Sequence, residues 1–241
     1  VQHGLGGDRT NAFFMADQFA DACFIVASFD LPMHGITNTA SPLYQAANER
    51  TFNVDLQNNT TGASTPDGKI DNSGVHSIPT LLSSPLGGRD LLRQGQADVS
   101  VVAKSLTRLD ITGDAVADVD PTRVHYVGLS LGGIAGVAQA KYAPGIRTVT
   151  VAAPGGVLTR ILRESPSFAP TVNAAVSATV PIGSTLYDNL FREIQTIADP
   201  GDPINHICEC AGNKPFHLIK VVADTVVPNS TTDLLIRAAN L

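Results

Sequence analysis

The strongest constraint on the fold is one short stretch, residues 124–136, which reads VHYVGLSLGGIAG. Residues 124–129 form an apolar, β-branched run, which favours a buried strand, and residues 131–142 favour a helix. A Gly-x-Ser-x-Gly element between a strand and a helix predicts a sharp turn that presents its serine, Ser130, at the edge of a sheet. The chain is therefore expected to contain a sheet that carries a serine nucleophile.

The residues around Ser130 fit that chemistry. Gly128 and Gly132 are small, so backbone can pack closely against a strained turn. The helix that starts at Leu131 places free N–H groups beside the serine, and the Leu131 N–H is expected to be one donor of an oxyanion hole. The alternative is a glycine-rich junction with an idle serine, which the strand before it and the helix after it disfavour.

A second glycine-rich stretch, QHGLGGD at residues 2–8, opens the sequence. A His-Gly-x-Gly loop that leaves a strand can present the second oxyanion donor, which we expect to be the N–H of Leu5. His3 is then a residue that shapes the loop rather than the base. A glycine-rich turn without a role is the alternative.

A carboxylate follows the predicted strand at 216–222. In VVADTVVP, residues 221–228, Asp224 stands at the carboxyl end of that strand, the sheet edge where ligands gather in open α/β sheets. The chain order Ser, Asp, His is the one expected on such a sheet, so Asp224 is the candidate acid that orients an imidazole. An aspartate that caps a helix is the alternative.

The remaining elements alternate in type. Further strands are predicted at 23–29 and 147–152, and further helices at 11–20, 90–109 and 185–198. This alternation predicts one α/β domain over residues 1–241, with a mostly parallel central sheet and helices on both faces. Two stretches interrupt it: a polar excursion at 39–85, and a Pro-broken helical insertion at 156–203 that resembles a lid or cap over a pocket.

Charge and cysteines limit the function. The net charge is −6 and basic residues are scattered, which excludes a phosphate-tracking nucleic-acid groove and favours a lipid or small ester as partner. Cys208 and Cys210 form either a strained disulfide or two reduced thiols, while Cys23 is predicted to be buried in a strand. No cofactor or metal site is expected. Six aspartates have oxygen ligands of the kind Ca²⁺ uses but lack EF-hand spacing, so solvated acidic turns are favoured over calcium. They are Asp67, Asp71, Asp110, Asp114, Asp118 and Asp120.

Several stretches together resemble a known family. QHGLGGDRTN, ASFDLPMHG, PDGKIDNSG, GGRDLLRQGQAD, VGLSLGGI and VADTVVP are similar to the α/β-hydrolase fold and, within it, to bacterial extracellular lipases and lysophospholipases of the Vibrio outer-membrane type. The resemblance implies a Ser-His-Asp mechanism on carboxylic lipid esters, and an extracellular or outer-membrane location. It also implies association of the full-length protein with a membrane surface.

The catalytic histidine of that family follows one more strand after the acid, yet 241 − 224 = 17 residues follow Asp224 and none is a histidine. We therefore expect an internal fragment whose first strands and last strand are missing, with the base downstream. His34, His76 and His125 are interpreted as structural, and His217 starts the acid's own strand at the far end. His206, on an unassigned loop, is the remaining substitute base.

Two other functions stay open at this point. A hydrolase-like binding module without catalysis would lack the histidine by nature. A thioesterase or peptidase would share the nucleophile, because the same constellation serves several acyl-transfer reactions.

Overall fold

A parallel three-stranded sheet lies at the centre of the molecule. The structure, a computed structural model, describes residues 1–143 and 145–241. The strands β1 (Val124–Leu129), β2 (Ile146–Ala152) and β3 (Phe216–Ile219) pair in the order β1-β2-β3. Their carboxyl ends are aligned, since Leu129 pairs with Ala152 and Ala152 pairs with Ile219. The turns that follow the three strands therefore meet at one sheet edge.

The free edge of β1 is covered by the start of the chain. The Gln2 N–H donates to the carbonyl of Val127 (2.8 Å), and the Leu129 N–H donates to the carbonyl of Gln2 (3.1 Å). This pairing brings the glycine-rich loop after Gln2 to the end of β1, beside Ser130.

The predicted strand at 23–29 is wrong. Among the described residues, no strand pairs with this segment. Its two bonds to the start of the chain run from the Val1 amine to the carbonyl of Ala27 (2.8 Å) and from Gln2 Nε2 to the carbonyl of Phe29 (3.1 Å). The prediction that Cys23 is buried is also wrong: Cys23 follows α1 (Phe13–Asp21), has a φ of 61° and is exposed. The strand predicted at 216–222 ends earlier, at Ile219, because its partner β2 ends at Ala152.

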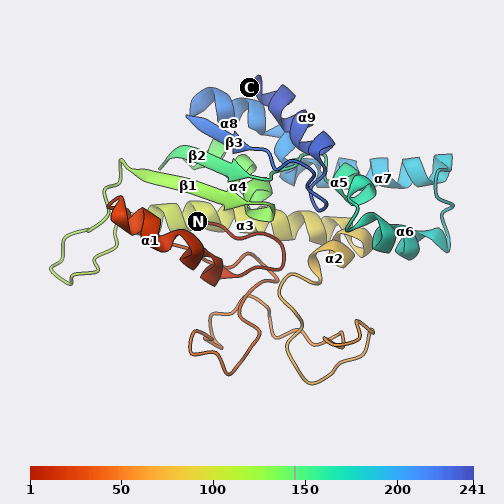
Figure 1. The fold of residues 1–241 in the computed structure, drawn as a ribbon, viewed down its shortest axis with the longest axis horizontal. Helices are drawn as coiled ribbons and strands as arrows, with labels where there is room; N and C mark the ends of the chain where they lie inside the picture. Colours follow the sequence, from red (N-terminus) through yellow and green to blue (C-terminus); the bar gives the residue numbers. More distant parts are fainter. Residues whose placement is uncertain (144) are drawn as a thin grey trace.

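Helices cover the sheet. On one face α4 (Leu131–Tyr142), α3 (Pro85–Leu106), α8 (Ile207–Asn213) and α9 (Asn229–Ala239) enclose the main core. On the other side, the Phe24 ring lies edge-on to His125 of β1, with 5.6 Å between the ring centroids. In Figure 1, α1 lies in the foreground beside β1 while α3 runs through the background. The predicted fold class, α/β with a parallel sheet flanked by helices, is confirmed.

A second, smaller core lies to one side. It joins α2 (Ser77–Ser83), which comes from the excursion, to α5 (Leu158–Glu164), α6 (Ala169–Ser177) and α7 (Thr185–Ala198) of the insertion. The buried side chains of this core include Leu162, Tyr187 and Phe191. Figure 1 shows these helices gathered beyond the carboxyl ends of the strands. The insertion predicted at 156–203 is thus helical and packs on the excursion.

Short 3₁₀ turns complete the chain at Arg9–Ala12, Asp199–Gly201 and Pro203–Asn205. Within the described residues, no helix is both long enough and apolar enough to cross a bilayer.

Candidate active site

Ser130 occupies a strained turn between β1 and α4. Its backbone has φ 51° and ψ −114°, a conformation that a non-glycine residue rarely adopts. The turn is fixed on both sides, because the Ser130 N–H donates to the carbonyl of Ala152 (2.8 Å) and the Ser130 carbonyl accepts from Ile134 N–H (2.9 Å). Among the described residues, none forms a hydrogen bond with Ser130 Oγ.

The two flanking glycines are required by close backbone contacts. A Cβ at Gly132 would lie 2.5 Å from the carbonyl oxygen of Gln2 and 2.7 Å from that of His3. A Cβ at Gly128 would lie 2.5 Å from the carbonyl oxygen of Gly132, which also accepts a hydrogen bond from the buried Tyr126 hydroxyl (2.7 Å). The start of α4 therefore packs directly on the backbone that leads into the glycine-rich loop.

That loop passes beside the serine. A Cβ at Gly4 would lie 3.2 Å from Ser130 Cβ and 3.7 Å from Ser130 Oγ. Leu5 and Leu131 both line the cavity that Ser130 borders, and neither backbone N–H donates to another described residue. Two residues with free amides thus line the cavity that Ser130 borders, and an oxyanion hole needs two such donors.

His3 holds the loop in place. Its Nε2 accepts a hydrogen bond from Leu31 N–H (3.0 Å), so the proton is on Nδ1, which donates to the carbonyl of Gly4 (2.8 Å). Burial lowers the pKa of His3 and keeps the ring neutral. Further along, the Ser73 hydroxyl donates to the carbonyl of Gly7 (2.6 Å). His3 shapes the loop and does not present a nitrogen to Ser130.

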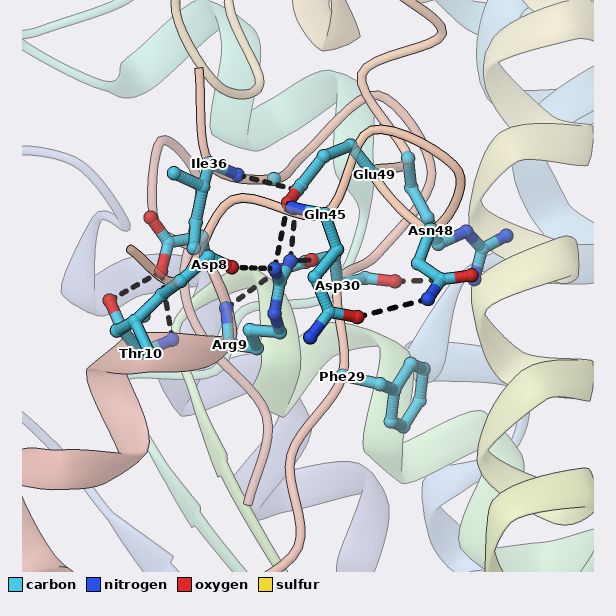
Figure 2. Close-up of polar contacts among 12 residues, drawn as sticks. Asp8, Arg9, Thr10, Phe29, Asp30, Ile36, Gln45, Asn48 and Glu49 are labelled. Atoms are coloured by element: carbon cyan, nitrogen blue, oxygen red, sulfur yellow. Dashed lines mark hydrogen bonds and ion pairs between the residues drawn. The ribbon is translucent and has the colours of Figure 1, made fainter. Parts of the chain in front are cut away.

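A buried ion cluster anchors the residue after the loop (Figure 2). Arg9 donates to both carboxylate oxygens of Glu49 (2.7 and 2.9 Å) and to Asp30, and its backbone N–H also donates to Asp30 (2.6 Å). The side chains of Glu49 and Asp30 are 0% and 2% exposed. Burial opposes ionisation of Glu49, but the hydrogen bonds from Arg9, Gln45 N–H and Ile36 N–H outweigh it and lower its pKa.

Asp224 lies in the turn after β3, at the same sheet edge as Ser130. Its Oδ1 accepts the backbone N–H groups of Val226 (2.8 Å) and Val227 (3.0 Å). Its Oδ2 receives no hydrogen bond from any residue that the structure describes. One carboxylate oxygen is thus fixed, and the other is left for a partner.

The cavity beside Ser130 has a volume of about 130 Å³ and an apolar lining. Its described polar side chains are Ser130, His34 and Ser77. The walls come from separate parts of the chain. Val226 and Val227 belong to the Asp224 loop, and further residues come from α2, the first part of α3, and α5 with Phe168. The apolar wall residues are Leu5, Leu31, Pro32, Ile78, Leu81, Leu91, Leu92, Leu131, Ile134, Leu158, Ile161, Leu162, Phe168, Val226 and Val227.

His34 is the histidine that borders this cavity, a position that the sequence interpretation did not foresee. Its Nδ1 donates to the carbonyl of Pro32 (2.9 Å), and a Cβ built on Gly74 would lie 2.3 Å from its Nε2. The ring is 1% exposed, and burial lowers its pKa to about 4. His34 Nε2 packs against Gly74 and is buried without a hydrogen-bond partner among the described residues, so no bond joins it to Ser130 Oγ.

Three other histidines, His206, His76 and His125, have contacts elsewhere, and His217 is exposed on β3. The structure does not bring His206 to Ser130: its ring stacks edge-on against Tyr142, at the opposite end of α4, and its Nε2 donates to the carbonyl of Pro200 (3.1 Å). The 12 residues of α4 separate the two ends by about 18 Å. His76 pairs with Asp71 (2.7 Å), and His125 bonds Thr148 (2.8 Å).

The described residues contain no group of three His, Cys, Asp or Glu side chains that could hold a metal ion. The aspartates weighed for calcium turn toward backbone amides instead: Asp110 accepts from Gly113 and Ala115, and Asp71 from Leu56 and Gln57. Cys208 and Cys210 lie on α8 as separate thiols, and burial raises the pKa of Cys210 to about 11.

Comparisons with known proteins support the fold. No protein-family model and no curated protein sequence matches this chain. The structure of acetyl xylan esterase 1 from Thermoanaerobacterium sp. JW/SL YS485 matches with a TM-score of 0.53 and 18% identity, over 98% of this chain and 63% of that chain. Puromycin hydrolase, as an S511A mutant complexed with PGG, matches with a TM-score of 0.44 and 18% identity, over 70% of this chain and 22% of that chain. This chain therefore spans less than two thirds of the length of the esterase, whose likeness bears out the predicted α/β-hydrolase fold.

Proposed function

We propose that this chain is a serine hydrolase that cleaves carboxylic esters with an apolar acyl group. The observation that carries the proposal is the setting of Ser130. It stands on strained backbone at the start of a helix, beside a second free amide and against an apolar cavity. Strain of this kind persists where the surrounding structure enforces it, and it gathers at functional sites.

In the proposed reaction Ser130 Oγ attacks the ester carbonyl while a base takes its proton. The N–H groups of Leu5 and Leu131 stabilise the oxyanion, and the alcohol leaves with the proton that the base returns. Water then releases the acid from Ser130. Asp224 Oδ2 holds the imidazole of the base in its working orientation and stabilises its charged form.

The proposed base is a histidine outside residues 1–241. Among the described residues, no hydrogen bond joins a histidine to Ser130 Oγ. Both nitrogens of His3 are bonded to backbone groups. His34 Nε2 is buried without a hydrogen-bond partner, and His206 lies at the far end of α4 from Ser130. The free Oδ2 of Asp224 is the oxygen that such a histidine would meet.

The apolar lining of the cavity supports a lipid ester as the substrate, because moving an alkyl chain from water into an apolar cavity lowers the free energy. The resemblance to bacterial extracellular lipases and lysophospholipases points to the same substrates. It also supports an extracellular or outer-membrane location and association of the full-length protein with a membrane surface.

Imidazole in solution tests this proposal without a histidine from the chain. Hydrolysis of p-nitrophenyl butyrate is measured with and without imidazole for the wild type, Ser130→Ala and the matched control Ser77→Ala, which alters another serine on the same cavity. We expect imidazole to raise the rate of the wild type and of Ser77→Ala well above that of Ser130→Ala. Equal imidazole-dependent rates in all three proteins would contradict catalysis by Ser130 and favour a binding module.

A further inference from the structure

The cavity wall has two halves that belong to different parts of the fold. Val226 and Val227 come from the turn that carries Asp224, whereas Ile161, Leu162 and Phe168 come from the insertion. Figure 1 shows the chain before α9 lying beside α5. An acyl group in the cavity would therefore touch both halves at once.

Ser165 joins the two halves. It ends α5, is 0% exposed, and donates from Oγ to the carbonyl of Thr225 (3.0 Å). The same Oγ accepts a hydrogen bond from Phe168 N–H (3.2 Å). The backbone N–H of Ser167 also donates to the Thr225 carbonyl (3.0 Å). One buried hydroxyl thus connects a residue of the cavity wall to the turn of the candidate acid.

The Thr225 carbonyl, which accepts the bond from Ser165, is part of the peptide group whose N–H donates to Asp224. Thr225 C=O and Val226 N–H are the two ends of one planar peptide group, and Val226 N–H donates to Asp224 Oδ1 (2.8 Å). Rotation of this peptide moves both ends together. The chain of bonds therefore runs from Phe168 through Ser165 and one rigid peptide to the carboxylate, and successive hydrogen bonds polarise one another.

From this geometry we infer that Ser165 is a positioning residue that couples filling of the acyl cavity to the orientation of the Asp224 carboxylate. An acyl chain that packs on Phe168 steadies the Ser165 hydroxyl and, through the peptide, Oδ1 of Asp224. Oδ2 is then directed toward the base. The inference rests on the proposed function and adds to it the way in which substrate is sensed.

The matched pair for the test is Ser165→Ala and Ser167→Ala. Ser165→Ala removes the bond to Thr225, whereas Ser167→Ala keeps its bond because the donor is backbone. Ser165→Cys has nearly the same size and a weaker donor, so it keeps the packing if the alanine variant unfolds. Asp224→Asn assigns the Asp224 Cγ resonance in ¹³C spectra.

Decanol is the probe, because it has an alkyl chain and cannot be hydrolysed. We expect decanol to shift the Asp224 Cγ resonance in the wild type and in Ser167→Ala. The shift should be smaller in Ser165→Cys and mostly lost in Ser165→Ala, although these proteins still bind decanol. A shift in Ser165→Ala equal to that in Ser167→Ala would overturn the inference, as would binding to the wild type that leaves Asp224 unmoved.

The imidazole assay with the short butyrate ester separates this inference from the proposed function. Coupling in the spectra without Ser130-dependent hydrolysis would overturn the function alone. Ser130-dependent hydrolysis with no Ser165-dependent shift would overturn the coupling alone.

Discussion

The Ser130 turn and the excursion before α2, residues 39–76, both border the glycine-rich loop, but they are held by opposite means. The turn is held by backbone packed on backbone, as at Gly132 against Gln2 and His3. The excursion is held by buried carboxylates that accept hydrogen bonds, as Glu49 does from Ile36 N–H and Asp71 does from Leu56 N–H.

The two regions should therefore tolerate different substitutions. Tightly packed backbone cannot move aside for one added carbon, yet it carries no charge and is insensitive to the loss of a counterion. Carboxylate anchors tolerate changes of shape around them, but they depend on a charge partner inside the protein.

Arg9→Ala should destabilise the excursion most. It leaves the carboxylates of Glu49 and Asp30 buried without their cation, for which we expect a loss of about 4 kcal/mol in the free energy of unfolding. Urea unfolding measures it. The matched control is Arg50→Ala, because its partner Asp98 stays 21% exposed and also accepts from Gln94. Equal losses in both variants would contradict the role given to the buried carboxylates.

Gly132→Ala should break the turn. The new Cβ would clash with two backbone carbonyl oxygens whose positions are fixed by the surrounding structure. We expect the free energy of unfolding to fall by about 3 kcal/mol. The control is Gly133→Ala on the same helix, where the added Cβ would lie 3.4 Å from its nearest neighbours, an ordinary contact distance. Because alanine has the better helix propensity, this variant should unfold with an unchanged free energy or one raised by up to about 1 kcal/mol. Thermal unfolding of both variants decides the point, and similar midpoints would show that the turn is not tightly packed.

His34 lies where the two regions meet and should make stability depend on pH. Its pKa is about 4 when folded and about 6.5 when unfolded, so the unfolded chain binds the extra proton between these values. The stabilisation is complete above pH 6.5 and is lost as the pH falls toward 4, by up to about 3 kcal/mol. His34→Gln should flatten the slope of stability against pH in this window. An unchanged slope in His34→Gln would count against the assignment.

Ser130→Gly should have the smallest effect and the opposite sign. Glycine adopts the positive φ of this turn without strain, so we expect a gain of about 1 kcal/mol in stability. Ser130→Ala removes the hydroxyl but keeps the strain, which makes it the control. If the two variants unfold at the same urea concentration, Ser130 is not strained.

The part of the site that is local in sequence could be predicted. The strand at 124–129 and the helix at 131–142 have the bounds expected from their patterns, because short-range periodicity and glycine placement determine them. The segment at 23–29 has the composition of a strand but no ladder, because strand formation depends on a partner that composition does not reveal.

Long-range contacts could not be predicted. Arg9 meets Glu49 across 40 positions, and Ser165 meets Thr225 across 60, without any pattern in the sequence that pairs them. The sequence predicts a structural role for His34, but its place on the cavity wall depends on its contact with Gly74, 40 positions away. The one available signal for Ser165 was its position between two helical patterns, beside Pro166.

If Ser130 is a nucleophile, it can be trapped covalently. The folded chain is incubated with an octyl phosphonofluoridate and imidazole, and its peptides are analysed by mass spectrometry. In the expected reaction Ser130 Oγ bonds to phosphorus, fluoride leaves, and imidazole takes the serine proton. We expect a phosphonyl group on the Ser130 peptide that depends on imidazole and is absent in Ser130→Ala. A folded chain with no adduct at Ser130, or with the adduct on another residue, would contradict it.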